Sequence, residues 1–209
     1  MTNIKIALLG LLAAATAALL GIVGATGCHK QSSGIPIASY SALKPDHLEL
    51  KRCILKLAGT IVTADIVQTR KGDEIVIDLR ALGQVFETER YTSTDQDFCV
   101  LDAGGEVYDP PIPLIKYPMR VGDEWDWTGR IMTGQQPHPA KAKVTTASEA
   151  MMVNGGTVPA AVRVQVELQI DSGRPNAPSK RMLTFWIAPD MGVVRRSFGD
   201  YSSREPAEE

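Results

Sequence analysis

The sequence predicts a mostly β protein, with a single antiparallel β domain behind an N-terminal signal or anchor segment. Two observations support this prediction: apolar residues alternate with polar ones over many short runs, and glycine-containing turns separate those runs. The length of 209 residues suits one domain. A half-barrel, a closed barrel and a sandwich all fit this pattern.

The clearest strand lies at residues 162–170. Its five apolar residues occupy every second position and alternate with polar side chains. A strand with this pattern has one buried face and one wet face, whereas a helix would spread the same residues around its axis.

Similar runs predict about eight to ten strands in all. Short turns between them favour antiparallel pairing. The proline-rich residues 109–113 are expected to form a crossover loop, because proline cannot serve a central strand. Short helical turns are possible at residues 39–46 and 148–152. The further predicted strands lie at residues 48–57, 61–67, 74–80, 85–91, 98–101, 125–131, 142–146, 182–188 and 193–198.

The N-terminal segment has the layout of a signal peptide. Lys5 precedes 22 uncharged residues, 6–27, which end in small side chains directly before Cys28. Residues 25–28 resemble the bacterial lipobox, although Ala25 stands where that motif usually has Leu, Val or Ile. The resemblance implies cleavage before Cys28 and attachment of lipid to its thiol.

Two other interpretations of this segment stay open. The 22 uncharged residues are long enough for an uncleaved N-terminal helix that spans a membrane, and ordinary secretion is the third possibility. All three place the rest of the chain outside the cytoplasm. The predicted organisation is a lipoprotein signal peptide at 1–27, a tether at 28–39, the β domain at 40–200 and a polar, frayed tail at 201–209.

Cys53 and Cys99 are the only cysteines left once Cys28 carries lipid. An oxidising cell envelope permits a disulfide between them, which we expect. Two separate buried thiols are the alternative, since free cysteine is often a core residue.

The composition and motifs argue against several function classes. The net charge of −2 disfavours nucleic-acid binding, and three histidines leave little material for a metal site. The sequence lacks a nucleophile elbow, a zinc-protease motif, a P-loop and a dinucleotide fingerprint. We therefore expect no enzyme, no catalytic residue, no metal and no cofactor. Glu87 and Glu89 alternate with polar neighbours and are expected on a wet strand face.

Two segments carry a family resemblance. Residues 117–129 hold a Pro-x-x-Val-Gly-x-x-Trp turn, and residues 185–195 hold a Trp-x-Ala-x-x-x-Gly-Val-Val-Arg hairpin. Both resemble bacterial envelope lipoproteins of unknown function that are often compared to the LolA-like half-barrel. We expect Trp125, Trp127 and Trp186 to fill core, with an apolar ligand groove as the alternative.

The expected function is that of a membrane-anchored extracytoplasmic lipoprotein that binds an apolar or peptide ligand. Residues 182–188 look apolar on both faces, which favours a second, ligand-covered surface. The alternative is an accessory subunit of an envelope protein complex, docking through sheet edges or the proline-rich segment. Its expected location is the cell envelope, facing the periplasm or the exterior, held to the membrane by lipidated Cys28 or by an N-terminal helix.

Overall fold

A computed structural model of the chain describes residues 50–153, 156–171, 178–189, 191–199 and 202–207. The predicted signal peptide, Cys28, the tether and the first residues of the predicted domain lie outside these ranges. In the described part of the chain, no helix is both long enough and apolar enough to cross a membrane.

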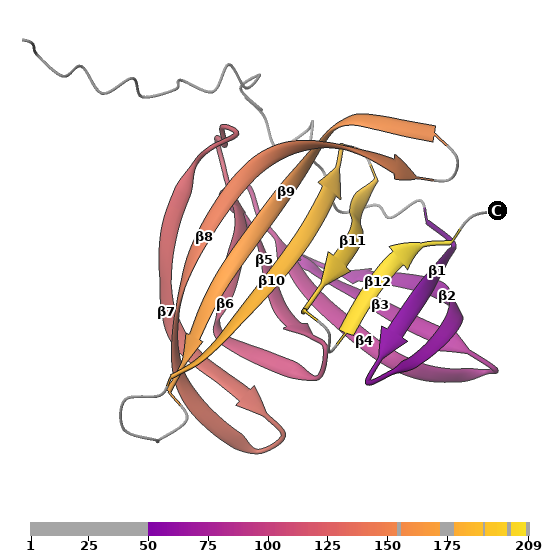
Figure 1. The fold of residues 1–209 in the computed structure, drawn as a ribbon, viewed down its shortest axis with the longest axis horizontal. Coiled ribbons are helices and arrows are strands. Elements are labelled where there is room, and N and C mark those ends of the chain that lie inside the picture. Colours follow the sequence, from indigo (N-terminus) through magenta and orange to yellow (C-terminus); the bar gives the residue numbers. More distant parts are fainter. Residues whose placement is uncertain (1–49, 154–155, 172–177, 190, 200–201, 208–209) are drawn as a thin grey trace, which may run out of the picture. The chain divides into compact units, whose positions relative to one another are not determined.

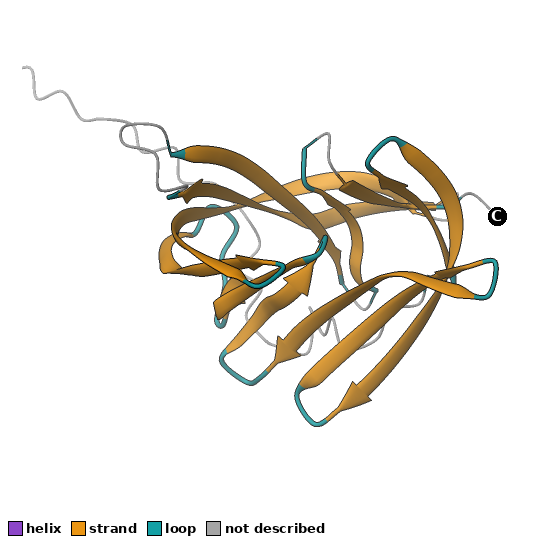
Figure 2. Ribbon diagram, turned by 90° about the horizontal axis from the view of Figure 1, so that it is seen from below, coloured by secondary structure: helices purple, strands orange, loops and turns teal. Residues whose placement is uncertain are grey.

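The described residues form twelve strands (Figures 1 and 2). This confirms the mostly β fold, with more strands than the eight to ten predicted. The strands are β1 (Arg52–Leu57), β2 (Thr60–Lys71), β3 (Glu74–Ala81), β4 (Gln84–Ser93), β5 (Asp97–Ala103), β6 (Glu106–Lys116), β7 (Glu124–Thr133), β8 (Gln136–Val153), β9 (Gly156–Ile170), β10 (Ser179–Ala188), β11 (Gly192–Ser197) and β12 (Ser202–Pro206).

Every strand pairs antiparallel with its neighbours in sequence, and β1 pairs with β12 to close the sheet. In Figure 1 the yellow β12 lies beside the indigo β1. The architecture is therefore the closed barrel among the three that the sequence left open. Closure removes the unpaired edges that an open sheet would expose.

The up-and-down order gives the barrel two ends. We call the end where β1 begins and β12 finishes the proximal end, and the opposite end the distal end. The turns at Ala58-Gly59, Leu82-Gly83 and Gly104-Gly105 all lie at the distal end, because β1, β3 and β5 run toward it.

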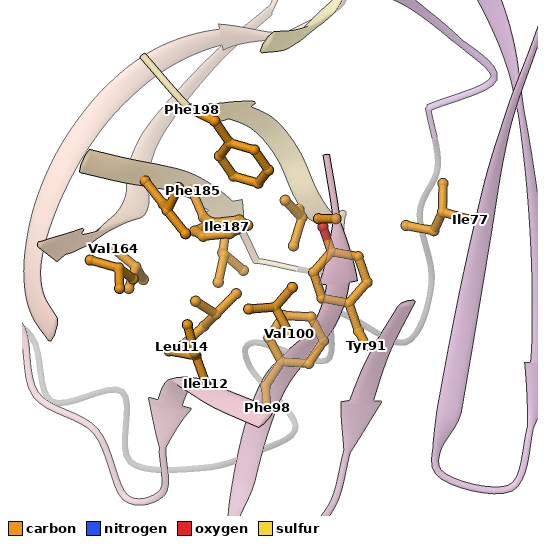
Figure 3. Packing of buried hydrophobic residues seen from close by; sticks show 14 of the residues in the cluster. Ile77, Tyr91, Phe98, Val100, Ile112, Leu114, Val164, Phe185, Ile187 and Phe198 are labelled. Carbon is orange, nitrogen blue, oxygen red and sulfur yellow. The ribbon is translucent and has the colours of Figure 1, made fainter. Parts of the chain in front are cut away.

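The interior is filled by apolar side chains that follow the predicted alternation. On β9, Val162, Val164, Val166 and Leu168 are almost fully buried, as the sequence pattern requires. Figure 3 shows buried side chains from opposite strands, such as Phe185 and Val100, pointing into one shared interior.

The proline-rich residues 109–113 belong to β6, so the prediction of a crossover loop is wrong. The ladder between β6 and β7 stops at Asp109 opposite Arg130, which leaves the following carbonyl groups of β6 without a strand partner there. The indole N–H groups of β7 replace that partner. Trp127 Nε1 donates to the Pro110 carbonyl and Trp125 Nε1 to the Pro113 carbonyl, both at 3.0 Å.

The polar tail predicted at residues 201–209 is also corrected. Ser202–Pro206 is a strand that pairs with both β11 and β1, and Arg204 is fully buried. Residues 148–152, where a helical turn was possible, are part of β8 instead. The polar strand Ser202–Pro206 therefore closes the barrel between β11 and β1.

Cys53 and Cys99 are two separate buried thiols, so the predicted disulfide is wrong. Cys53 lies on β1 and Cys99 on β5, with three strands between them in the wall. A disulfide needs Cα atoms within about 7 Å, whereas four strand spacings of about 4.8 Å separate the two strands along the sheet. Burial raises the pKa of the Cys53 thiol to about 11 and that of Cys99 to about 12.

Candidate functional site

Four charged side chains inside the barrel form what we call the charge cluster: Glu87, Glu89, Arg196 and Arg204. Glu87 and Glu89 occupy alternate positions of β4, Arg196 lies on β11 and Arg204 on β12. Glu89, Arg196 and Arg204 have no exposed side-chain surface, and Glu87 is 6% exposed. The expectation of a wet face for both glutamates is therefore wrong.

Glu89 is the centre of the charge cluster. Its Oε1 accepts from Arg196 Nε at 2.8 Å and from Arg204 Nε at 2.7 Å. Its Oε2 accepts from Arg204 Nη2 at 3.0 Å and from the Tyr91 hydroxyl at 2.7 Å. Burial alone would raise the pKa of Glu89, but the charges of Arg204 and Arg196 outweigh burial and hold it at about 2. Glu89 is therefore ionised at neutral pH.

Glu87 is only half satisfied. Its Oε1 accepts from Arg196 Nη2 and from the backbone N–H of Gly104, the latter at 2.7 Å. Its Oε2 is buried and has no hydrogen-bond partner among the described residues. Burial raises the pKa of Glu87 by more than the charge of Arg196 lowers it. A buried acceptor without a donor is costly, and such atoms need a physical explanation.

The charge cluster ties opposite parts of the wall together. Along the wall, β1, β2 and β3 separate β4 from β12, yet Glu89 binds arginines of β11 and β12 directly. The pairs therefore cross the interior. Breaking such a buried pair leaves an unpaired charge, which is strongly destabilising.

A second charged pair crosses the interior between β6 and β10. The Arg181 guanidinium donates to Glu106 Oε1. The hydroxyl groups of Thr133 and Tyr108 lie 3.5 Å from the two carboxylate oxygens of Glu106. Unlike Glu87, Glu106 has contacts to both of its oxygens.

Glu87 also lines a pocket at the distal end, which we call the rim pocket. The pairing between β4 and β5 begins at Arg90 opposite Asp102. The earlier residues of β4, which lie nearer the distal end, are therefore not paired with β5. The pocket has a volume of about 470 Å³, within the range of small-molecule sites. Its lining combines apolar, polar and glycine positions: Leu57, Ala58, Phe86, Glu87, Thr88, Asp102, Gly104 and Gly105.

Gly104 shapes one wall of the rim pocket. A Cβ atom at this position would lie 2.6 Å from the ring of Phe198, and the residue has a positive φ of 65°. Only glycine fits both constraints without strain. The close approach brings the Gly104 N–H onto Glu87 and holds the β5–β6 turn beside β4.

Apolar side chains gather near the same end of the barrel. Leu82, at the tip of the β3–β4 turn, is 97% exposed, and Val85 and Phe86 follow it at 50% and 39%. Ile61, at the start of β2, is 65% exposed. Of these four, Phe86 also lines the rim pocket.

The structure brings Trp125 and Trp127 together but separates both from Trp186. The first two face inward from β7, where their indole groups bind β6. Trp186 alternates with the buried Phe185 and Ile187 of β10 and faces outward under the Arg195 guanidinium, 4.6 Å from its ring. The three therefore do not share one groove. A ligand role for any of them stays a prediction.

No group of three or more metal-ligating side chains occurs among the residues that the structure describes. The acidic and basic groups of the charge cluster bind one another. Among the described residues, Glu87 Oε2 and Arg204 Nη1 have no hydrogen-bond partner. Chemically, the arrangement leaves one buried acceptor and one buried donor unpaired, and the acceptor belongs to a residue that also lines the rim pocket.

Sequence reasoning missed the whole charge cluster. The alternation of Glu87, Glu89 and Tyr91 places the three on one face of β4, and the aromatic Tyr91 is the signal that could have identified this face as the buried one. The positions of Arg196 and Arg204 gave no such indication, because their partners lie 107–115 residues away along the chain.

The sequence matches no protein-family model, and no curated protein matches it. Among solved structures, the chain is similar to a presumed exported protein with a YmcC-like fold from Bacteroides fragilis. The identity is 15%, the match covers 76% of this chain and 95% of the other, and the TM-score is 0.41.

Proposed function

We propose that this chain is an exported, membrane-tethered β-barrel that binds a small ligand in its rim pocket. The observation that carries the binding role is that Glu87, whose buried Oε2 has no partner among the described residues, lines a pocket of about 470 Å³. A fold that leaves a buried carboxylate oxygen without a donor gains free energy when a ligand supplies one.

The N-terminal sequence supports export and tethering. Lys5, the uncharged residues 6–27 and the small side chains before Cys28 have the order of a lipoprotein signal peptide. Acyl chains on Cys28 would hold the protein on a membrane, since each buried methylene contributes about 0.8 kcal/mol.

Intact-protein mass spectrometry of the chain from its native membrane tests the tether. We expect loss of residues 1–27 and added acyl mass, with both changes abolished in a Cys28→Ala variant. An unmodified, uncleaved N-terminus would exclude the lipoprotein and leave the single-span anchor.

A fragment screen by NMR tests the binding role. The full-length chain, held in phosphatidylcholine nanodiscs, is titrated with small cationic, neutral and anionic fragments. We expect saturable shifts at the backbone amides of Gly104, Gly105 and Phe86. If no fragment of any charge shifts these signals, the rim pocket is not a binding site.

The exposed apolar residues support the second candidate, an accessory subunit of an envelope complex. Leu82, Val85 and Ile61 are exposed at the distal end, and their burial by a partner would stabilise the complex. Crosslinking from position 82 in native membranes distinguishes the candidates: a single reproducible protein partner would favour the accessory role over a small ligand.

A further inference from the structure

We propose that the ligand of the rim pocket is a small protonated amine that carries an apolar group. This inference rests on the proposed binding role and names the chemistry of the ligand. The ammonium group would pair with the carboxyl group of Glu87, and the apolar group would lie against Phe86.

The charge of the pocket favours a cation. Glu87 and Asp102 are the two ionisable residues of its lining, and both are acids. Arg196 binds Glu87 through Oε1 and divides its charge between Glu87 and Glu89. An anionic ligand would meet two acidic side chains in the lining.

The unpaired acceptor of Glu87 favours a ligand that carries a hydrogen-bond donor. Glu87 is 94% buried by side-chain exposure, and its Oε2 lacks a partner although Oε1 has two. A charged donor forms a stronger bond to a carboxylate than a neutral hydroxyl does. The site thus distinguishes an amine from an alcohol of the same shape.

The other lining residues favour an apolar body on that amine. Leu57, Ala58 and Phe86 supply apolar surface to the pocket, and Phe86 keeps 39% of its surface exposed. Burial of this exposed ring surface by an alkyl or aromatic group would add to the binding free energy. Each buried methylene of the ligand is expected to tighten binding about threefold to fourfold.

The test is an NMR titration of the full-length chain in phosphatidylcholine nanodiscs at pH 7. The probes are propyl-, butyl- and pentylammonium, with the matching alcohols and carboxylates as comparisons and empty nanodiscs as a control for partitioning. We expect saturable shifts at Gly104, Gly105 and Phe86 with the amines, tightening along the series. The alcohols are expected to bind at least tenfold more weakly, and the carboxylates not to bind there.

Glu87→Gln removes the charge with little change of shape and is expected to weaken amine binding roughly tenfold to hundredfold. Phe86→Ala should abolish the dependence on chain length. Glu124→Gln is the matched control, because Glu124 lies on β7 with its side chain 54% exposed, away from the pocket. If Glu87→Gln fails to fold, Asp102→Asn and Phe86→Ala carry the test, and wild-type affinity in both would overturn the inference.

The possible outcomes separate this inference from the binding role itself. Equal binding of alcohols and amines, or preference for carboxylates, would overturn the amine inference while the pocket remains a binding site. Amine-induced shifts confined to other parts of the barrel would overturn it as well. A pocket that binds no fragment of any charge would contradict the proposed function.

Discussion

Removal of one member of the charge cluster should destabilise the barrel severely. Glu89→Gln leaves Arg204 and Arg196 buried without the carboxylate that holds both of them. Loss of one partner from a buried ion pair costs about 3–5 kcal/mol. For a domain of this size, each kcal/mol lowers the melting temperature by roughly 2–4 °C, so the expected decrease is roughly 6–20 °C.

The assay is thermal and urea denaturation of the full-length chain in mild detergent, followed by circular dichroism. Glu124→Gln serves as the control, since the Glu124–Lys143 pair on the outer wall has both side chains more than half exposed. Its loss is expected to change the melting temperature little. A shift with Glu89→Gln no larger than that of the control would refute the reasoning.

A double-mutant cycle shows whether Glu89 and Arg204 act together. Arg204→Met alone leaves Glu89 with only Arg196 and Tyr91, so we expect a large loss of stability. The double variant should lose less than the sum of the two single variants, because neither charge is then left without its partner. Strict additivity would mean that the two side chains contribute independently.

The pH dependence of stability provides a separate test. The folded protein holds the pKa of Glu89 at about 2, below its ordinary value of 4.5. The ionised carboxylate therefore stabilises the fold above pH 4.5, and this contribution is lost as the pH falls toward 2. Glu87 acts in the opposite direction because its pKa is raised. We expect the acid slope between pH 4.5 and 2 to be shallower in Glu89→Gln than in the wild-type chain.

Three further predictions address the parts of the fold that the sequence did not reveal. Gly129→Ala places a Cβ 2.5 Å from the Trp127 indole and should cost about 1–3 kcal/mol in urea denaturation, whereas Gly156→Ala, with 3.5 Å of room, should cost little. Burial raises the pKa of Cys53 to about 11 and that of Cys99 to about 12, so both thiols should resist alkylation at pH 8 in the folded chain. Both should react after unfolding without reductant, whereas a disulfide would prevent both reactions. Truncation of the chain before β12 should abolish the cooperative unfolding transition, and a wild-type transition would show that β12 does not close the barrel.

The alternation of apolar residues was enough to predict the fold class. Residues 162–170 show it best, because both neighbouring strands are long and regular and each inward position meets the apolar core. Closure into a barrel could not be predicted in this way, since it depends on β12. That strand contains no large apolar residue, and its inward Arg204 binds Glu89 of the distant strand β4.

The proline rule failed at residues 109–113 for a local reason. Proline lacks a backbone N–H, which destabilises a strand only where a carbonyl of the neighbouring strand would accept from it. On the β7 side the ladder has already ended at Asp109. Pro113 and Pro110 contribute their carbonyl groups instead, which accept from Trp125 and Trp127 respectively. The tryptophans and the prolines were each visible in the sequence, but their pairing was not.

The candidate site was hidden by a bulge. Val85 faces outward and Glu87 inward although they lie two positions apart, because the β3–β4 register shifts between Leu79 and Arg80. A bulge adds one residue to the strand, so the residues after it point to the opposite face from the one that the alternation before it predicts. The polar neighbours Thr88 and Arg90 gave no sign of this change, and Glu87 and Glu89 were therefore expected on a wet face.

The rim pocket is tested most directly at the carboxyl carbon of Glu87. In a chain labelled with ¹³C at glutamate carboxyl groups, butylammonium should shift the Glu87 signal in a saturable way and leave the Glu124 signal unchanged. The Glu87→Gln variant assigns the signal. A Glu87 resonance that does not respond, or that moves in parallel with exposed glutamates, would contradict the assignment of Glu87 as the ligand acceptor.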